Sequence, residues 1–279
     1  MKYKTVGIVA KPHQGVIPYL KKAIDILKSL KVEVFLEKMA AELLGMKSEF
    51  PREEIAHCSD IIILIGGDGT FLSVASQAVE QDVPVAGFNL GRLGFLTELK
   101  KEELEENLTD IVHGRMKISE RTLLQLQFSG EDSLALNDVV VSKGNISRVV
   151  IFLLEIDDLY VAEIKADGLI ISTPTGSTAY SLAAGGPIVT PNVNGMVVTP
   201  ICPHALTFRP LVIPDSSRVR VKLISDSPEV FITIDGQKVI PMCSGDYFET
   251  TIAAKKLRLV ASKNINYFRL LNEKLNWGL

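Results

Sequence analysis

The chain has 279 residues, a formal net charge of −3 and 47% hydrophobic residues. This length allows two ordinary domains with separate cores, the composition excludes general disorder, and the slightly acidic balance provides no basic surface for nucleic acid. Its apolar runs are too short to span a bilayer or to form a signal-peptide core, so we expect a cytoplasmic protein without a membrane segment whose partners are small molecules or proteins.

Strand and helix patterns alternate through the first third of the chain. Apolar residues recur at helical spacing between residues 17 and 30, and again between residues 71 and 79. This alternation predicts an α/β domain over residues 1–98, built on a Rossmann-like, doubly wound parallel sheet. The runs with strand composition are residues 6–10, 32–36, 61–65 and 83–88.

The pattern changes after a charged helical stretch at residues 104–111, which Gly114 is expected to end. Short β-like runs then follow one another with turns between them. We therefore expect a mostly β domain over residues 99–263. The runs are residues 123–128, 149–156, 160–164, 219–223, 230–234, 238–240 and 257–260.

Two hairpin tips and a terminal helix complete the predicted elements. Asp157-Asp158 and Asp235-Gly236 have the composition of tight hairpin turns, and we assign Asp235 to its turn rather than to catalysis. The tail regains helical spacing, which predicts a helix within residues 264–279 that packs back on the first domain.

The five residues Gly66-Gly67-Asp68-Gly69-Thr70 are the most informative in the chain. They follow a buried strand and open a helix, where backbone N–H groups at the positive end of the helix dipole bind phosphate. A carboxylate beside phosphate is tolerable if it accepts a proton from a hydroxyl nucleophile or faces a divalent cation. The turn therefore predicts phosphoryl transfer with Asp68 as the catalytic residue, the alternative being that Asp68 only caps the helix.

A second glycine-bearing loop, residues 89–95, follows the run at 83–88. Because ligands bind at the carboxyl ends of strands in open parallel sheets, we expect this loop and the Asp68 turn on the same rim. Arg92 in this loop is a candidate for contact with a phosphate donor, although an exposed loop arginine is the commoner case.

The second informative stretch is residues 167–187, which is dense in hydroxyl groups, glycine and proline. Its hydroxyls can donate and accept hydrogen bonds, and Tyr180 adds a flat ring on which a base can stack. The alternative is an ordinary surface turn. Against it, the helix-prone run at residues 180–184 follows directly, so that a polar loop again leads into a helix.

In these motifs the chain resembles the NAD kinases from end to end. The glycine-rich turn at 66–70 is shared with diacylglycerol, sphingosine and 6-phosphofructokinases, whereas residues 173–180, Thr-Pro-Thr-Gly-Ser-Thr-Ala-Tyr, are much more diagnostic. The motifs that occur in the family's order and approximate spacing are Gly66-Gly67-Asp68-Gly69-Thr70, Leu93-Gly94-Phe95-Leu96, Asn137-Asp138 and residues 167–187.

The resemblance implies ATP-dependent phosphorylation of the 2′-hydroxyl on the adenosine ribose of NAD, which yields NADP. It also implies Mg²⁺ or a similar cation, held mainly by the nucleotide phosphates. Asp68 matches the family acid near that hydroxyl, and we expect it to orient the hydroxyl and to accept its proton late in the transfer. No protein-bound transition metal is expected, because the cysteines and histidines are scattered.

Family members bind NAD through an Asn-Glu pair, matched here by Asn137 and Asp138. Three further residues, matched by Thr178, Ala179 and Tyr180, surround the adenine, so the resemblance implies that the β domain over residues 99–263 binds NAD and mediates oligomerisation. Asp167 matches an acid that reaches the ligand from a neighbouring subunit, so the resemblance implies a dimer or tetramer. The full set of ligand-binding candidates is Gly66, Gly67, Gly69, Thr70, Asn137, Asp138, Arg148, Lys165, Asp167, Thr178, Ala179, Tyr180, Ser181, Ala183 and Gln237.

Two residues depart from the family pattern. Asp138 is one methylene shorter than the usual Glu, and Ala183 stands where many relatives carry Ser. Two other functions stay open at this point. A lipid or sugar-alcohol kinase would share the turn around Asp68, and a non-catalytic NAD(P)-sensing module would share the binding loops without turnover.

Overall fold

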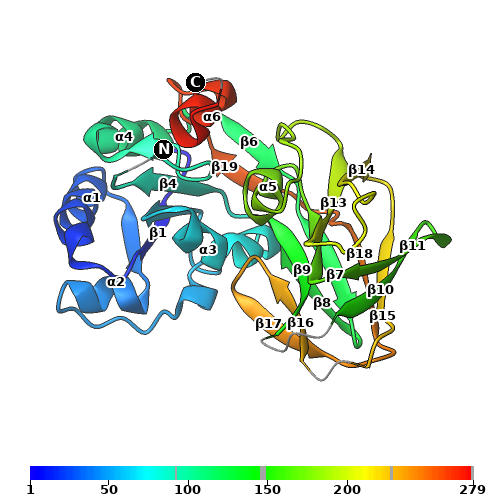
Figure 1. The fold of residues 1–279 in the computed structure, drawn as a ribbon. Helices are drawn as coiled ribbons and strands as arrows, with labels where there is room; N and C mark the ends of the chain where they lie inside the picture. Colours follow the sequence, from blue (N-terminus) through cyan, green and yellow to red (C-terminus); the bar gives the residue numbers. More distant parts are fainter. Residues whose placement is uncertain (92, 145–148, 227–228, 278–279) are drawn as a thin grey trace. The chain divides into compact units, whose positions relative to one another are not determined.

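The computed structural model describes residues 1–91, 93–144, 149–226 and 229–277. The chain divides into two compact units, Met1–Glu120 with Leu257–Leu279, and Arg121–Lys256 (Figure 1). The first unit is α/β with a parallel sheet and the second is built on antiparallel sheets, which confirms the predicted fold class. In the described residues, no helix combines the length and apolarity required to cross a membrane.

The first unit is built on a parallel sheet with the strand order β2-β1-β3-β4-β19-β6, on which β5 pairs with β4. Its winding reverses between β1 and β3, the point at which open α/β sheets bind ligands. The strands are β1 (Thr5–Ala10), β2 (Glu33–Leu36), β3 (Ile61–Ile65), β4 (Val85–Asn89), β5 (Leu99–Lys100), β6 (Ile118–Arg121) and β19 (Leu257–Val260).

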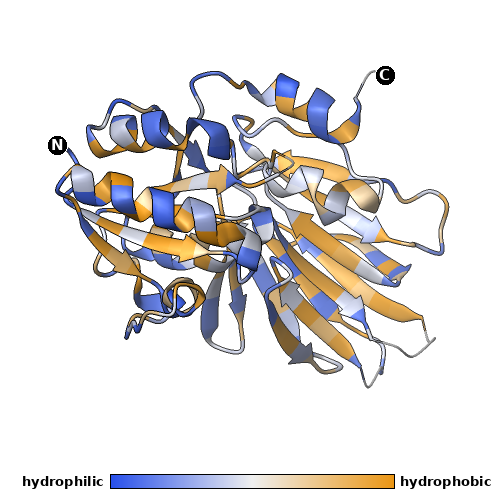
Figure 2. Ribbon diagram, turned by 90° about the vertical axis from the view of Figure 1, so that its left-hand side faces the viewer, coloured by the Kyte–Doolittle hydropathy of each residue, from blue (hydrophilic) through white to orange (hydrophobic). Residues whose placement is uncertain are grey.

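Helices cover this sheet through apolar stripes. Strand β3 is buried along its whole length, as its five apolar residues predict for a strand covered on both faces. Figure 2 shows the strands mainly orange, whereas the helices carry orange and blue residues side by side. The helices are α1 (Ile17–Ser29), α2 (Lys38–Leu43), α3 (Asp68–Glu80), α4 (Leu104–Val112) and α6 (Tyr267–Leu275), with 3-10 turns at Gln14–Val16, Arg52–Glu54 and Lys101–Glu103.

The second unit consists of two antiparallel sheets that share one hydrophobic core. The first sheet has the order β11-β10-β15-β18-β7-β8 and the second β14-β13-β12-β9-β16-β17. The elements are β7 (Leu124–Phe128), β8 (Glu131–Ala135), β9 (Asp138–Lys143), β10 (Val150–Ile156), β11 (Leu159–Ala166), β12 (Gly168–Ser172), β13 (Gly195–Ile201), β14 (Leu211–Pro214), β15 (Val219–Leu223), β16 (Val230–Ile234), β17 (Lys238–Met242), β18 (Tyr247–Ile252), a 3-10 turn at Gly176–Thr178 and α5 (Tyr180–Ala183).

The units divide at other residues than the sequence boundaries 98/99 and 263/264. Helix α4 packs on α1 and therefore belongs to the first unit. Strand β19, expected in the β domain, lies in the parallel sheet, where Leu259 pairs with Val85 of β4. Local composition marks both segments correctly as helix and strand, but their partners are distant in sequence. Tyr267 of α6 contacts the ring of Phe95, so the tail also packs within the first unit.

Candidate active site

Asp68 lies at the start of α3, where β3 ends. The helix cap is the extended backbone of Gly67 without a side-chain hydrogen bond, so the alternative that Asp68 only caps the helix is wrong. Its carboxylate reaches the loop after β4 instead. Oδ2 accepts the backbone N–H of Phe95 at 3.0 Å, and Oδ1 accepts those of Leu96 and Thr97 at 3.1 Å. The predicted shared rim is therefore confirmed.

The two oxygens of Asp68 are loaded unequally. Oδ1 also accepts the hydroxyl of Thr97 at 3.0 Å, so the described residues provide three donors to Oδ1 and one to Oδ2. Asp68 is half-buried, so a lone pair of Oδ2 is available to an incoming hydroxyl. Gly94 permits this close approach, because a Cβ at that position would lie 2.0 Å from Oδ1. The described contacts hold the carboxylate in one orientation, and Oδ2, which accepts one of them, has a second lone pair that can accept a proton.

The glycines of this turn have different tasks. A Cβ at Gly66 would lie 2.9 Å from Thr70 Oγ1, so this glycine is required by the turn itself. A Cβ at Gly67 or Gly69 would meet nothing within 4 Å. The space above the first N–H groups of α3 is therefore open, as the approach of a phosphate requires.

A buried ion pair braces this end of the first unit. Glu37, after β2, is fully buried and accepts Nη2 and Nε of Arg52 at 2.6 and 2.8 Å, and this hydrogen bonding raises the pKa of Arg52. Nη1 of Arg52 donates to Ser73 Oγ at 3.0 Å, and Ser73 donates to the carbonyl of Thr70 at 2.7 Å. The pair links the end of β2 to the first turns of α3. Sequence reasoning missed it, because nothing in the local pattern pairs these residues.

In the second unit the structure brings Asn137 together with the hydroxyl-rich loop. The carbonyl of Asn137 accepts the N–H of Thr173 at 2.9 Å, and Thr173 Oγ1 donates to the carbonyl of Leu136 at 2.6 Å. Gly176 lies so close that a Cβ there would be 1.9 Å from the Asn137 oxygen. The loop is thus a packed part of the unit, which argues against an ordinary surface turn.

The hydroxyl groups of this loop divide into internal and open ones. Ser177 is buried and donates to the carbonyl of Pro174 at 2.6 Å, and Ser181 is buried against Thr199 at 2.9 Å. The hydroxyl of Ser181, a predicted ligand-binding residue, is therefore hydrogen-bonded in the interior of the unit. The predicted residues that stay partly or fully accessible in this loop are Thr178, Ala179, Tyr180 and Ala183, with Tyr180 47% exposed.

Asp235, which the sequence assigns only to its turn, contacts the segment that carries Asn137 and Asp138. It forms the β16–β17 hairpin tip with Gly236, at φ values of 50° and 66°. Its Oδ2 accepts the N–H of Leu136 at 2.7 Å, and its Oδ1 accepts those of Asn137 and Asp138 at 2.7 and 3.1 Å. These donors are almost 100 residues away in sequence, so no local signal points to them.

Asp138 is buried, with 5% of its surface exposed. Burial, and to a lesser extent the charge of Asp235, raise the pKa of Asp138 to about 7. Burial also raises the pKa of Asp235, although the hydrogen bonds from the backbone of residues 136–138 oppose this shift. Below about pH 7 the pair therefore places a protonated carboxyl, that of Asp138, beside the N–H-bonded carboxyl of Asp235.

This shift predicts a pH-dependent stability. The folded-state pKa of Asp138, about 7, lies above its usual 3.8, so the folded state binds the extra proton between these values. The free energy of unfolding should fall as pH rises from about 4 to about 7, by an amount on the order of 4 kcal/mol. Urea unfolding at several pH values checks this against Asp138→Asn, which cannot ionise. A stability difference between the two proteins that does not change with pH would contradict it.

The other candidates are placed as follows. Asp167 is half-buried and forms an ion pair with Lys143 at 2.6 Å. Lys165 and Gln237 are exposed. Arg92 and Arg148 lie outside the described residues. Within residues 1–91, 93–144, 149–226 and 229–277, no group of three or more His, Cys, Asp or Glu side chains could hold a metal ion.

Family models for the ATP-NAD kinase N-terminal and C-terminal domains match residues 6–116 and 136–262. The NAD kinase of Syntrophotalea carbinolica is 41% identical over 283 residues and that of Geobacter sulfurreducens 40% over 284, each covering 99% of both chains.

Solved structures give the same result. A yeast NADH kinase complexed with NADH matches with a TM-score of 0.90 and 30% identity over 100% of this chain and 89% of that chain. An NAD kinase from Archaeoglobus fulgidus in complex with ATP matches with a TM-score of 0.80 and 26% identity over 96% and 99%. Since the two family models together span most of the sequence and the curated relatives align over nearly their whole length, the chain belongs to the ATP-NAD kinase family.

Proposed function

We propose that this protein transfers a phosphoryl group from ATP to the 2′-hydroxyl on the adenosine ribose of NAD, giving NADP. The relatives named above are NAD kinases, and the solved neighbours carry NADH and ATP. The observation that carries the chemistry is the position of Asp68, whose carboxylate accepts four hydrogen bonds from described residues, only one of them at Oδ2.

Asp68 acts as the general base in this proposal. In phosphoryl transfer the attacking oxygen gains little charge before the transition state, so positioning matters more than basicity. The hydrogen bonds from Phe95, Leu96 and Thr97 hold the carboxylate in one orientation. Oδ2 first accepts a hydrogen bond from the 2′-hydroxyl, then takes its proton as the new P–O bond forms and the ADP oxygen leaves.

The second unit supplies the residues that bind NAD. Asp138 begins β9 and Asn137 precedes it, and Gly176 of the hydroxyl-rich loop packs against the backbone of Asn137. Tyr180 offers an exposed ring to the adenine, and Thr178 and Ala179 precede it at the N-terminus of α5. A neutral Asp138 can donate a hydrogen bond to a ribose oxygen, which an ionised carboxylate cannot.

The donor phosphates are assigned to the first unit, at the open space over Gly67 and Gly69. A divalent cation fits this site only if the nucleotide holds it. In the part of the chain that the structure describes there is no cluster of potential ligands, and three of the four hydrogen bonds to Asp68 fall on one oxygen. Mg²⁺ bound by the phosphates would neutralise charge on the transferred group.

Oligomer formation stays a prediction. It rests on the match between Asp167 and a family acid that reaches a neighbouring subunit's ligand. Asp167 forms an ion pair with Lys143 of the same chain, so this role would require its carboxylate to contact both Lys143 and the neighbouring subunit's ligand. A cytoplasmic location also stays a prediction from the sequence.

A coupled assay of NADP formation tests the proposed function. The purified protein is given NAD or NADH with ATP, another nucleoside triphosphate or inorganic polyphosphate, in the presence and absence of Mg²⁺. We expect NADP formation with ATP and Mg²⁺, and a mass measurement in solution reports the oligomeric state. Absence of phosphorylated product with every donor would overturn the proposal.

Gly67→Ala is expected to raise the KM for ATP by about tenfold while the KM for NAD stays unchanged. The added methyl group meets no protein atom within 4 Å, so it should lower the free energy of unfolding by less than about 1 kcal/mol. It nevertheless occupies the space that a phosphate needs to reach the first N–H groups of α3. Steady-state kinetics with each substrate varied in turn check this, and an unchanged KM for ATP would place the donor elsewhere.

A further inference from the structure

Three successive backbone N–H groups, those of Leu136, Asn137 and Asp138, converge on one carboxylate. Such a group of N–H donors forms a concave anion site, and here the anion is supplied by Asp235. The hairpin tip is tied to the same segment a second time, because the N–H of Asp235 donates to the carbonyl of Asp138 at 3.0 Å. The turn thus fixes the backbone from which Asn137 and Asp138 project.

We propose that Asp235 is a positioning residue of the NAD site, which acts through the backbone of Asn137 and Asp138 rather than by touching the substrate. This inference rests on the proposed function, because it takes Asn137 and Asp138 as NAD-binding residues. The side chain of Asp235 is committed to three donors on the protein, with two bonds at 2.7 Å. An acceptor is required in this position, because a buried N–H group without a partner is energetically costly. Without the acceptor, residues 136–138 would shift until these N–H groups found other partners.

The hairpin itself does not need the carboxylate. Its two central residues have positive φ values, the geometry that Asn-Gly and Gly-Gly turns adopt as readily as Asp-Gly. Asp235→Asn therefore keeps the turn and the size of the side chain but replaces one acceptor oxygen by an NH₂ group that faces a backbone N–H. Asp235→Gly keeps the turn without strain and removes the acceptor altogether.

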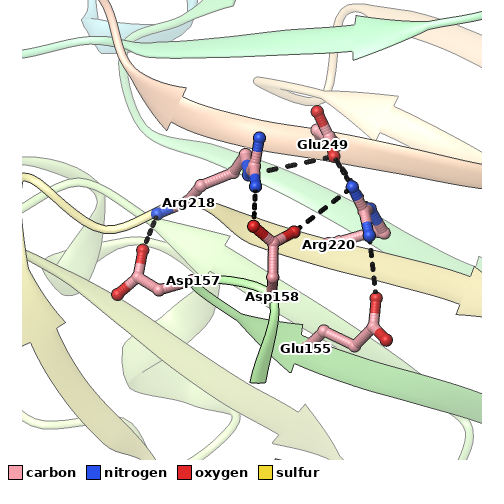
Figure 3. Close-up of polar contacts among 6 residues, drawn as sticks. All are labelled: Glu155, Asp157, Asp158, Arg218, Arg220 and Glu249. Atoms are coloured by element: carbon pink, nitrogen blue, oxygen red, sulfur yellow. Dashed lines mark hydrogen bonds and ion pairs between the residues drawn. The ribbon is translucent and has the colours of Figure 1, made fainter. Parts of the chain in front are cut away.

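Asp157 provides a matched control in the same unit. It also lies at a hairpin tip with a positive φ, 54°, and its Oδ1 accepts a backbone N–H, that of Arg218, at 2.8 Å. Figure 3 shows this bond beside the ion pairs that Asp158 forms with Arg218 and Arg220. Among the described residues, the hydrogen-bond partner of Asp157 is Arg218, which is not assigned to NAD. Asp157→Asn therefore makes the same chemical change at a turn that should not matter for the substrate.

The experiment compares wild-type protein, Asp235→Asn, Asp235→Gly and Asp157→Asn by steady-state kinetics, calorimetric titration with NAD and thermal unfolding. We expect Asp235→Asn to raise the KM and Kd for NAD by about tenfold, Asp235→Gly to raise them further, and kcat and the KM for ATP to change by less than about twofold. Asp157→Asn should match the wild type. This split between NAD affinity and turnover would not follow from a general loss of stability.

Other outcomes overturn the inference. If Asp235→Asn binds NAD like the wild type, Asp235 only stabilises its hairpin, whatever happens to the melting temperature. If Asp235→Asn does not fold, Asp235→Gly decides the question in the same way. Failure of the proposed function has a different signature, because then the wild type forms no NADP. If that wild type still binds NAD, the titrations alone decide on Asp235, and if it does not, the inference fails as well.

Discussion

Asp68→Asn is expected to lower kcat by about 10²- to 10⁴-fold while the affinity for NAD changes little. A general base contributes a factor of this size, and an amide cannot accept the proton of the 2′-hydroxyl. Asparagine can keep its oxygen in the Oδ1 position, which accepts three of the four hydrogen bonds, so the loop at residues 95–97 should stay in place. Single-turnover transfer and calorimetric NAD binding measure the two effects separately.

Thr97→Val separates the chemical role of Asp68 from its role in holding the loop. This variant removes the hydroxyl that donates to Oδ1 at 3.0 Å but leaves the carboxylate and the backbone N–H groups. Loss of one hydrogen bond of this kind should change kcat by less than about tenfold. If both variants lose activity equally, the loop and not the base is decisive. A non-catalytic NAD-sensing module would show no transfer in the wild type either.

Gly176→Ala is expected to raise the Kd for NAD by about 100-fold or more. It should also lower the free energy of unfolding by about 3 kcal/mol. The added Cβ would lie 1.9 Å from the carbonyl oxygen of Asn137 and 2.4 Å from its carbon. Backbone atoms cannot rotate away as a side chain can, so relief requires that the loop leave the start of β9.

Gly67→Ala is the control for this effect, since the same methyl group meets open space there. Urea unfolding and calorimetric titration with NAD compare the two variants. We expect a clear loss of stability and of NAD binding for Gly176→Ala, and neither for Gly67→Ala. A Gly176→Ala protein that binds NAD normally would show that the contact between the loop and Asn137 is dispensable.

Sequence reasoning succeeded where the signal is local. Five consecutive apolar residues predict that β3 is buried on both faces. The spacing of Phe71, Val74 and Ala78 predicts helix α3. Both hairpin tips were correct, because Asp157 and Asp235 have the positive φ values that their turns require. The roles of the individual ligand-binding residues remain predictions.

It failed where two distant segments decide the outcome. Strand β19 has ordinary strand composition, and only its pairing with β4 assigns it to the first unit. The hydroxyl of Ser181 lies in the interior beside that of Thr199 of β13, a contact that the local sequence does not indicate. Asp235 looked like a turn residue, and its contacts with residues 136–138 are visible only in three dimensions.

By itself the sequence determined the α/β and antiparallel β architecture, the turn that carries Asp68 and, through its motifs, the resemblance to the NAD kinases. These depend on residue types at short spacing, which hydrophobic periodicity and backbone preference translate directly into structure. Only the tertiary structure decided what the carboxylates do: Asp68 binds the loop after β4, and Asp235 binds the backbone before β9. A carboxylate accepts any N–H donor within reach, and which donor that is depends on how distant strands pack.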